Sequence, residues 1–301
     1  MREERASVNG IELCYETFGA PEDPALLLIM GLGGQMIWWD DELCRLLAAE
    51  GFHVIRFDNR DCGRSTVLHD APLPKARHLR KRDPRAAAYS LDDMASDAIG
   101  LLDHLGIRAA HVAGVSMGGM IAQALAIRYP QRVLSLCSIS STTGDPSVGK
   151  TKWRLYPVLF RPLPKDRAPH IDAFARMAKK IGSRRKYAPD MDQVRDLAGR
   201  SFDRGFWPEG TQRQFAAAVT APNRTPLLRD VRVPALVVHG ESDGLVGPSG
   251  GRATAEAIPG AKLVTIKHMG HDLPRQIWPQ LVSETADNAA RATGGIAVGA
   301  R

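Results

Sequence analysis

Short apolar runs alternate with longer stretches of helical periodicity along most of the chain. The apolar runs predict strands at residues 11–18, 25–30, 53–57, 111–115, 133–139, 235–239 and 262–266. Apolar residues recur at helical spacing within 41–50, 91–105, 276–291 and the segment that follows residue 116. Strands joined through helices pair in parallel, because such a crossover returns the chain to the same edge of the sheet. The pattern therefore predicts an α/β fold with a mostly parallel central sheet and flanking helices.

The link between the first two predicted strands and the ends of the helix at 91–105 refine this prediction. Only residues 19–24 separate the first two predicted strands, which is too short for a crossover helix, so we expect the sheet to open with antiparallel strands. The helix at 91–105 has recognisable limits, since Ser90 and Asp93 form an approximate capping box and Gly106 follows its last turn.

A long segment between the predicted strands at 133–139 and 235–239 lacks strand signals. From about residue 145 to 228 the chain carries short helical patterns that proline residues interrupt repeatedly. We interpret 145–228 as a helical cap inserted into an α/β core formed by 1–144 and 229–293. Residues 294–301 have too little apolar patterning to pack, so we expect a flexible tail there.

Composition limits the class of protein. The chain has 301 residues, of which 44% are hydrophobic, and no window of 18 uninterrupted apolar residues that would predict a membrane span. Charged residues at the start are not followed by an apolar stretch, so we expect a cytoplasmic protein without an export signal. The four cysteines are scattered and form no paired motif, which favours buried free thiols and predicts neither a metal nor a cofactor.

The net charge of +7 is unevenly distributed. Residues 150–186 contain twelve Lys or Arg and two Asp, and residues 75–85 contain six and one. Such basic segments attract anionic substrates, nucleic acid or anionic lipid, but solvated helix faces and a surface loop explain the same charge. Aromatic residues are not interleaved with the basic residues of 75–85, as base stacking requires, so we expect no nucleic-acid partner.

The strongest chemical signal is the sequence Gly114-Val115-Ser116-Met117-Gly118, which lies between a predicted strand and a predicted helix. This is the setting of a nucleophile elbow, in which a sharp turn exposes a serine at the carboxyl edge of the sheet. Glycines two residues before and after the serine let the strand and helix pass closely enough. Ser116 is therefore the predicted nucleophile.

A serine hydroxyl needs a base and a third group that orients the base. Asp243 follows the strand at 235–239 and His271 follows the strand at 262–266, so both are expected at the edge where Ser116 lies. The order Ser, Asp, His along the chain is the order that this architecture uses. The rival acids are Asp230 and Asp272; the rival bases are His268 and His239.

Acyl transfer also needs N–H donors for a developing oxyanion. One is expected from Met117, directly after the nucleophile at a helix start. The second is expected from the glycine-rich turn at 31–34, with the N–H of Leu32 as the chosen candidate. A simple loop cluster of glycines is the alternative explanation of that turn.

These motifs resemble the α/β-hydrolase fold family over nearly the whole chain. The segment Phe57-Asp-Asn-Arg-Asp-Cys-Gly-Arg-Ser65 is similar to a strand-end loop of that family, in which Asp58 and Arg60 hold structural positions. Together with Ala25-Leu-Leu-Leu-Ile-Met-Gly, it is also similar to aclacinomycin methylesterase-like and actinobacterial lipase/esterase-like serine hydrolases. One departure is Met30, which stands where many relatives have histidine, so the outer support of the oxyanion loop differs.

The combined prediction is a carboxylic ester hydrolase that acts on a hydrophobic small-molecule ester through an acyl-enzyme. A cofactor-free haloperoxidase or perhydrolase shares the Ser-Met-Gly-Gly context, and a non-catalytic small-molecule receptor on the same fold is the alternative from a different class. The acyl group, the alcohol and the oligomeric state stay open. The large side chains expected to line a substrate pocket are Trp153, Tyr156, Phe160, Phe206 and Trp207.

Overall fold

The strands of the molecule form one eight-stranded sheet in the order β1-β2-β4-β3-β5-β6-β7-β8. The computed structural model describes residues 3–160 and 163–294, except for the side chains at 159, 160, 293 and 294. The strands are β1 (Glu4–Val8), β2 (Ile11–Phe18), β3 (Ala25–Ile29), β4 (His53–Phe57), β5 (Ala110–Val115), β6 (Val133–Ile139), β7 (Ala235–Gly240) and β8 (Lys262–Ile266). All neighbouring pairs from β4 to β8 are parallel, which confirms the predicted sheet type.

The sheet opens with antiparallel strands, as predicted, but through different pairs than the sequence indicates. β1 was not predicted; it forms a hairpin with β2 across Asn9 and Gly10, whose φ values of 48° and 77° suit a tight two-residue turn. The strands β2 and β3 do not pair with each other, because β4 lies between them and is antiparallel to β2. The short linker at residues 19–24 therefore connects two strands, β2 and β3, that are separated in the sheet by β4.

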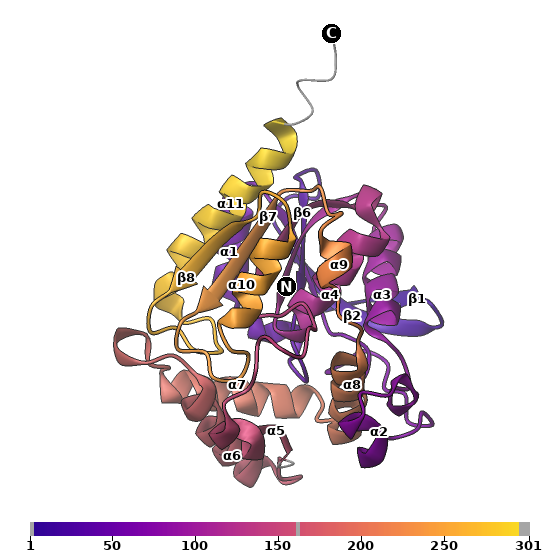
Figure 1. Cartoon of the computed structure of the whole chain (residues 1–301), viewed down its shortest axis with the longest axis vertical. Helices are drawn as coiled ribbons and strands as arrows, with labels where there is room; N and C mark the ends of the chain where they lie inside the picture. The colour runs from indigo at the N-terminus through magenta and orange to yellow at the C-terminus, as the bar shows by residue number, and fades with distance from the viewer. Residues whose placement is uncertain (1–2, 161–162, 295–301) are drawn as a thin grey trace.

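Helices cover both faces of the sheet (Figure 1). They are α1 (Asp41–Ala49), α3 (Leu91–His104), α4 (Met117–Arg128), α10 (Ser249–Ala257) and α11 (Trp278–Gly294). Leu26 and Leu28 of β3 belong to the apolar cluster that includes α1 and α11. Leu27 and Ile29 belong to the cluster with α3, α4 and α10. This alternation places consecutive strand residues in opposite layers, so the central sheet is buried on both sides.

Some helices begin and end where the sequence predicts, and others are longer or were not predicted. Both halves of the capping box between Ser90 and Asp93 are present at the start of α3. The helix α10 between β7 and β8 was not predicted, and α11 extends to Gly294. The rest of the expected tail, 295–301, lies outside the described residues. In the described ranges, no helix has the length and apolar character needed to cross a membrane.

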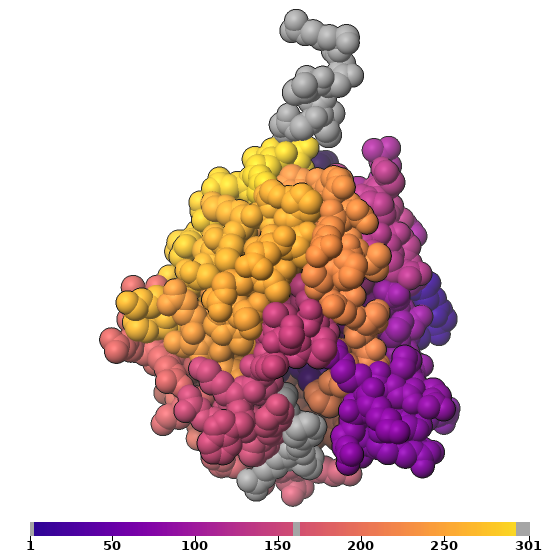
Figure 2. Space-filling view, in the orientation of Figure 1, coloured from indigo at the N-terminus to yellow at the C-terminus, as the bar shows by residue number. Residues whose placement is uncertain are grey.

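The segment between β6 and β7 contains helices and, in its described part, no strand. Its helices are α5 (Tyr156–Phe160), α6 (Arg167–Ile181), α7 (Met191–Arg204), α8 (Pro208–Thr220) and α9 (Thr225–Leu228). Short 3-10 turns complete the chain at Met36–Trp38, Pro84–Ala86, Pro130–Arg132, Trp153–Leu155, Arg185–Tyr187 and Arg275–Ile277. Figure 1 places α5, α6 and α7 together below the sheet, and α8 beside the short helix α2 (Ala76–Arg80). In Figure 2 the purple residues around α2 form a lobe of their own at the lower right of this face.

Candidate active site

Ser116 lies on a sharp turn between the end of β5 and the start of α4. Its φ of 58° and ψ of −118° are strained for a residue that carries a side chain. A Cβ atom at Gly114 would lie 2.1 Å from the carbonyl oxygen of Gly118, and one at Gly118 would lie 2.1 Å from that of Ile29. Both positions therefore require glycine, which explains the spacing of the motif. The turn leaves Ser116 partly exposed although its neighbours are buried.

A chain of two hydrogen bonds links Ser116 to the ends of two other strands. The Nε2 atom of His271 lies 3.0 Å from Ser116 Oγ, and its Nδ1 atom lies 2.7 Å from Oδ2 of Asp243. The other carboxylate oxygen of Asp243 accepts the backbone N–H groups of Leu245 and Val246 at 2.8 and 2.9 Å. The carboxylate is thus fixed from both sides and holds the ring.

The surroundings of His271 raise its basicity. Burial lowers the pKa of the His271 imidazole, but the negative charge of Asp243 and its hydrogen bond outweigh burial and raise that pKa above its ordinary value. When Asp243 accepts a hydrogen bond from the Nδ1–H group of His271, the neutral ring presents its lone pair on Nε2, toward Ser116. The site therefore holds a hydroxyl beside an oriented base.

The rival acids and bases make other contacts, although the Nε2 atom of His239 lies 3.6 Å from Oδ2 of Asp243. The side chain of Asp230 is 83% exposed and faces Arg232, and Asp272 accepts a hydrogen bond from Ser183. The ring of His239 is buried, and its Nε2 atom lies 2.9 Å from the carbonyl oxygen of Val246, which agrees with the predicted structural role. His268 has a φ of 69°, and its carbonyl oxygen accepts the N–H of Arg184.

The glycine-rich turn after β3 passes directly beside Ser116. A Cβ atom at Gly31 would lie 3.0 Å from the Cβ of Ser116. The N–H of Gly34 donates to the carbonyl of Gly31 at 3.1 Å, and the N–H of Gly33 donates to Oε1 of Gln214 at 2.8 Å. Within the described residues the N–H of Leu32 has no such acceptor. This amide is therefore free to donate to a bound group.

The N–H of Met117 is available for a different reason. Met117 is the first residue of α4, where a backbone N–H has no acceptor within its own helix. Ser141, which follows β6, donates its hydroxyl to the carbonyl oxygen of Ser116 at 2.7 Å and supports the elbow from the far side. Ser141 was not predicted from the sequence. Its position just after a strand that is parallel to β5 is the signal that could have placed it at the same edge of the sheet as Ser116.

The insertion between β6 and β7 holds the loop that carries His271. The N–H of His271 donates to the carbonyl of Ile181 at 2.8 Å, and the N–H of Gly270 donates to the hydroxyl of Ser183 at 2.9 Å. The N–H of Arg184 donates in the opposite direction, to the carbonyl of His268. No short motif announces these contacts, because they join segments that are far apart in the chain.

The residues expected to line a substrate pocket occupy several different places. Trp153 is 83% exposed and Tyr156 is 47% exposed, so neither forms a closed wall in this structure. The side chain of Phe160 lies outside the described residues. Phe206 packs inside the insertion, with its ring 4.4 Å from that of His170. Most of Trp153 is exposed to solvent and Phe206 contacts another ring of the insertion, so their place in a substrate pocket stays a prediction.

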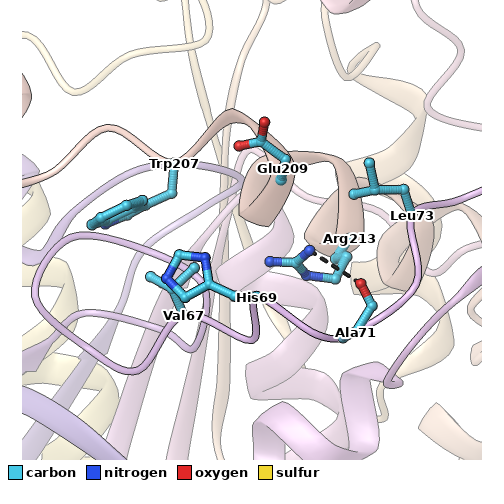
Figure 3. Close-up of a pocket in the computed structure, with 7 residues that line it drawn as sticks. All are labelled: Val67, His69, Ala71, Leu73, Trp207, Glu209 and Arg213. Atoms are coloured by element: carbon cyan, nitrogen blue, oxygen red, sulfur yellow. Dashed lines mark hydrogen bonds between the residues drawn. The ribbon is translucent and has the colours of Figure 1, made fainter.

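Trp207 lines a cavity of about 110 Å³ that is separate from Ser116 (Figure 3). Its Nε1 atom donates to the carbonyl of Gly63, and its ring packs edge-on against His69. The remaining side chains around this cavity are Val67, Ala71, Leu73, Glu209 and Arg213. The helix α8 begins at Pro208, and Trp207 just before it lies against the loop after β4, so a place of Trp207 in the substrate pocket stays a prediction.

The arrangement around Ser116 is suited to acyl transfer. It combines a hydroxyl, a base fixed by a carboxylate, and N–H groups at the start of a helix, which are the parts that nucleophilic catalysis requires. In the part of the chain that the structure describes, no three His, Cys, Asp or Glu side chains gather in a way that could hold a metal ion. All four cysteines are buried and unpaired, as predicted.

Known proteins resemble the chain over most of its length. A family model described as the alpha/beta hydrolase fold matches residues 24–274. A rhodomycin D methylesterase from Streptomyces sp. strain C5 is 29% identical over 305 residues, which cover 94% of this chain and 96% of that protein. A provisionally assigned non-heme bromoperoxidase from Mycobacterium tuberculosis is 29% identical over 270 residues, which cover 87% of this chain and 91% of that protein. The solved enol-lactonase from Burkholderia xenovorans LB400 has a TM-score of 0.72 and 25% identity, covering 95% and 100%.

These similarities agree with the architecture in two respects. The family match begins just before β3 and ends after β8, so it includes every strand of the parallel part of the sheet. The methylesterase and the enol-lactonase align over nearly their full lengths, so the insertion is included in the similarity. The chain therefore belongs to the α/β-hydrolase fold family, and it is an enzyme of the carboxylic ester hydrolase class.

Proposed function

We propose that the enzyme hydrolyses its ester through a covalent acyl-serine intermediate, with Ser116 as nucleophile, His271 as general base and acid, and Asp243 as the group that orients the base. The observation that carries the proposal is the continuous hydrogen-bonded chain from Asp243 through His271 to Ser116. Hydrogen-bond reach between nucleophile, base and orienting acid is what activates a serine at neutral pH.

In the first half of the reaction, Ser116 Oγ attacks the acyl carbon while its proton passes to Nε2 of His271. The carbonyl oxygen becomes an oxyanion, which accepts hydrogen bonds from the N–H groups of Leu32 and Met117. The ester bond then breaks, and the imidazolium returns its proton to the leaving alcohol. Asp243 stabilises the imidazolium without taking up a proton itself.

In the second half, water replaces the alcohol. His271 accepts a proton from water as its oxygen attacks the acyl carbon, and the same two amides bind the second oxyanion. The bond to Ser116 breaks, the serine regains its proton from His271, and the carboxylic acid leaves. The sum is one ester and one water converted to one acid and one alcohol.

The substrate class that we propose is a hydrophobic small-molecule ester, with a methyl ester as the first choice. The full-length similarity to a rhodomycin D methylesterase supports this choice. In this assignment residues 1–144 and 229–293 form the core. Residues 145–228 form a cap that supplies most of the walls of the substrate pocket. Contacts of the cap with the loops of His271 and Gly33 support that division.

The decisive experiment combines covalent labelling with an ester panel. A fluorophosphonate probe is expected to label the wild-type protein once per chain, at Ser116, and labelling is expected to be lost in Ser116→Ala. Hydrolysis of p-nitrophenyl esters of increasing length, and of aromatic methyl esters, is expected to fall by about 10⁶-fold in kcat in the same variant. Hydrolysis by Ser116→Ala at the wild-type rate would contradict the nucleophile assignment.

A peroxide-dependent halogenation is the second candidate activity, because a provisionally assigned bromoperoxidase is 29% identical to the chain. The same panel separates the two activities when peroxide and bromide are added. An ester hydrolase is expected to turn over esters without peroxide. Bromination that exceeds ester hydrolysis would favour the second candidate, and stoichiometric ligand binding without turnover would favour a receptor.

A further inference from the structure

We propose that Gln214, a residue of the insertion helix α8, is a positioning residue that holds the oxyanion loop in its active form. This inference rests on the proposed function, since it concerns the amide of Leu32 as an oxyanion donor. The side chain of Gln214 is fully buried and bonds at both ends. Its Oε1 accepts the N–H of Gly33 at 2.8 Å, and its Nε2 donates to the carbonyl of Arg60 at 2.7 Å.

The turn that Gln214 contacts has two possible conformations. Residues 31–34 form a tight turn closed by the bond from Gly34 N–H to Gly31 C=O. Gly33, the third residue, has a φ of 65°, whereas Leu32 is not among the residues with positive φ, which corresponds to a type II turn. Rotation of the peptide between Leu32 and Gly33 by about 180° converts a type II turn into type I, and glycine tolerates both forms.

Gln214 selects one of these conformations. The N–H of Gly33 belongs to the rotating peptide, and Gln214 Oε1 gives it a buried acceptor only in the observed form. In the flipped form the carbonyl of Leu32 would point toward Gln214 Oε1, two acceptors would face each other, and the N–H would lose its partner. The amide group of Gln214 cannot turn over to compensate, because its Nε2 is bound to Arg60.

This selection matters because of where the turn lies. A Cβ atom built on Gly31 would lie 3.0 Å from the Cβ of Ser116, so the turn lies directly against the nucleophile. The Leu32 N–H belongs to the peptide that precedes the rotating one, and we expect it to lose its fixed position when the bond from Gly33 to Gln214 no longer anchors the turn. Preorganised donors stabilise a transition state only when they already point at the oxyanion. The position of α8 against this turn is therefore expected to affect the rate of the chemical step, and to affect ester binding little.

The test compares two substitutions of Gln214 with a neighbouring control. Gln214→Leu removes both bonds and keeps the size, and Gln214→Glu restores an acceptor for Gly33. Thr211→Val is the control: Thr211 lies one turn earlier on α8 and packs against Gly33, but its hydroxyl bonds only to the carbonyl of Trp207. The measurements are kcat and KM for a p-nitrophenyl ester, the affinity for a trifluoromethyl ketone, and the pH dependence of kcat/KM.

Gln214→Leu is expected to lower kcat by about 10- to 100-fold, below the full effect of deleting an oxyanion donor, with KM changed by less than about threefold. Affinity for the trifluoromethyl ketone, which forms a tetrahedral adduct with serine, is expected to fall by a similar factor. Gln214→Glu is expected to recover only part of the loss, because its carboxyl group accepts the N–H of Gly33 but does not replace the bond to Arg60. Thr211→Val is expected to match the wild type. The apparent pKa of the acid limb is expected to stay constant, since His271 and Asp243 are untouched.

Two results would overturn the inference. One is equal kcat for Gln214→Leu and Thr211→Val. The other is a loss in Gln214→Leu that appears as fewer fluorophosphonate-labelled sites per chain, which is the sign of misfolding instead of mispositioning. Failure of the proposed function is recognised separately, because the wild-type protein itself would then show no labelling at Ser116.

Discussion

The Nε2 atom of His271 lies 3.0 Å from the Oγ atom of Ser116, although the two residues are 155 positions apart in the chain. Ser116 follows β5, and His271 stands on the loop after β8, three strands away in the sheet. The parallel direction of these strands places both loops at one edge. The first prediction concerns the residue that holds His271 in this position.

Asp243→Asn is expected to lower kcat for ester hydrolysis by about 10⁴-fold with little change in stability. The amide N–H of the asparagine can donate a hydrogen bond to Nδ1 of His271, which stabilises the wrong tautomer and places the ring proton on Nε2. Steady-state kinetics with a p-nitrophenyl ester provide the measurement, and Asp230→Asn, whose side chain is 83% exposed, is the control. Wild-type activity in Asp243→Asn would assign the acid role to another residue.

The pH dependence of kcat/KM is expected to show an acid limb above pH 6.5, the ordinary imidazole value. The base must be neutral to accept a proton, so activity falls as the pH decreases through the pKa of His271. Burial lowers that pKa, but the charge and hydrogen bond of Asp243 raise it further than burial lowers it. In Asp243→Asn the residual activity is expected to have its acid limb at lower pH, and a limb at the same pH would contradict this origin.

Gly118→Ala is expected to destabilise the protein by at least about 2 kcal/mol, because the added methyl group overlaps rigid backbone. Its Cβ would lie 2.1 Å from the carbonyl oxygen of Ile29 in the central strand β3. Gly199→Ala in the interior of α7 is the matched control, since its Cβ would meet the flexible end of Arg167. Urea unfolding compares the two, and equal stability would show that the strand can shift.

Arg204→Met is expected to cost about 3–5 kcal/mol of folding free energy, because it leaves a buried carboxylate without its partner. Arg204 of α7 lies 2.9 Å from Asp58 after β4 and 2.9 Å from Glu3. Burial raises the pKa of Asp58 and Arg204 opposes that rise. The loss is therefore expected to shrink at low pH, where Asp58 of the variant binds a proton.

The control for this prediction is an ion pair of the same type on the surface. Arg167 and Asp203 are each about half exposed and bond at 2.8 Å. Arg167→Met is expected to change the free energy of unfolding little, because solvent screens the pair. Similar losses in the two variants, measured by urea unfolding, would contradict the argument from burial. In Arg204→Met combined with Asp58→Asn, part of the loss is expected to be recovered.

Local features of the fold were predictable because their causes are local. The strands at 53–57, 133–139 and 262–266 have the predicted limits, since each is a short apolar run bounded by polar or turn residues. The capping box of Ser90 and Asp93 closes within one turn of helix. The motif around Ser116 requires glycine because strand and helix cross there, and this requirement is visible in five consecutive residues.

The sequence by itself determined the fold class, most of the order of its strands and helices apart from β1 and α10, and the candidate residues Ser116, Asp243 and His271. Each of these follows from periodicity, turn chemistry or strand direction. Only the tertiary structure decided which strands are neighbours, where Trp207 points and what Gln214 holds. These depend on contacts between segments that are far apart in the chain, such as the 181 positions between Gly33 and Gln214. Such contacts form when apolar surfaces pack in three dimensions, and no short stretch of sequence encodes which partner a buried side chain meets.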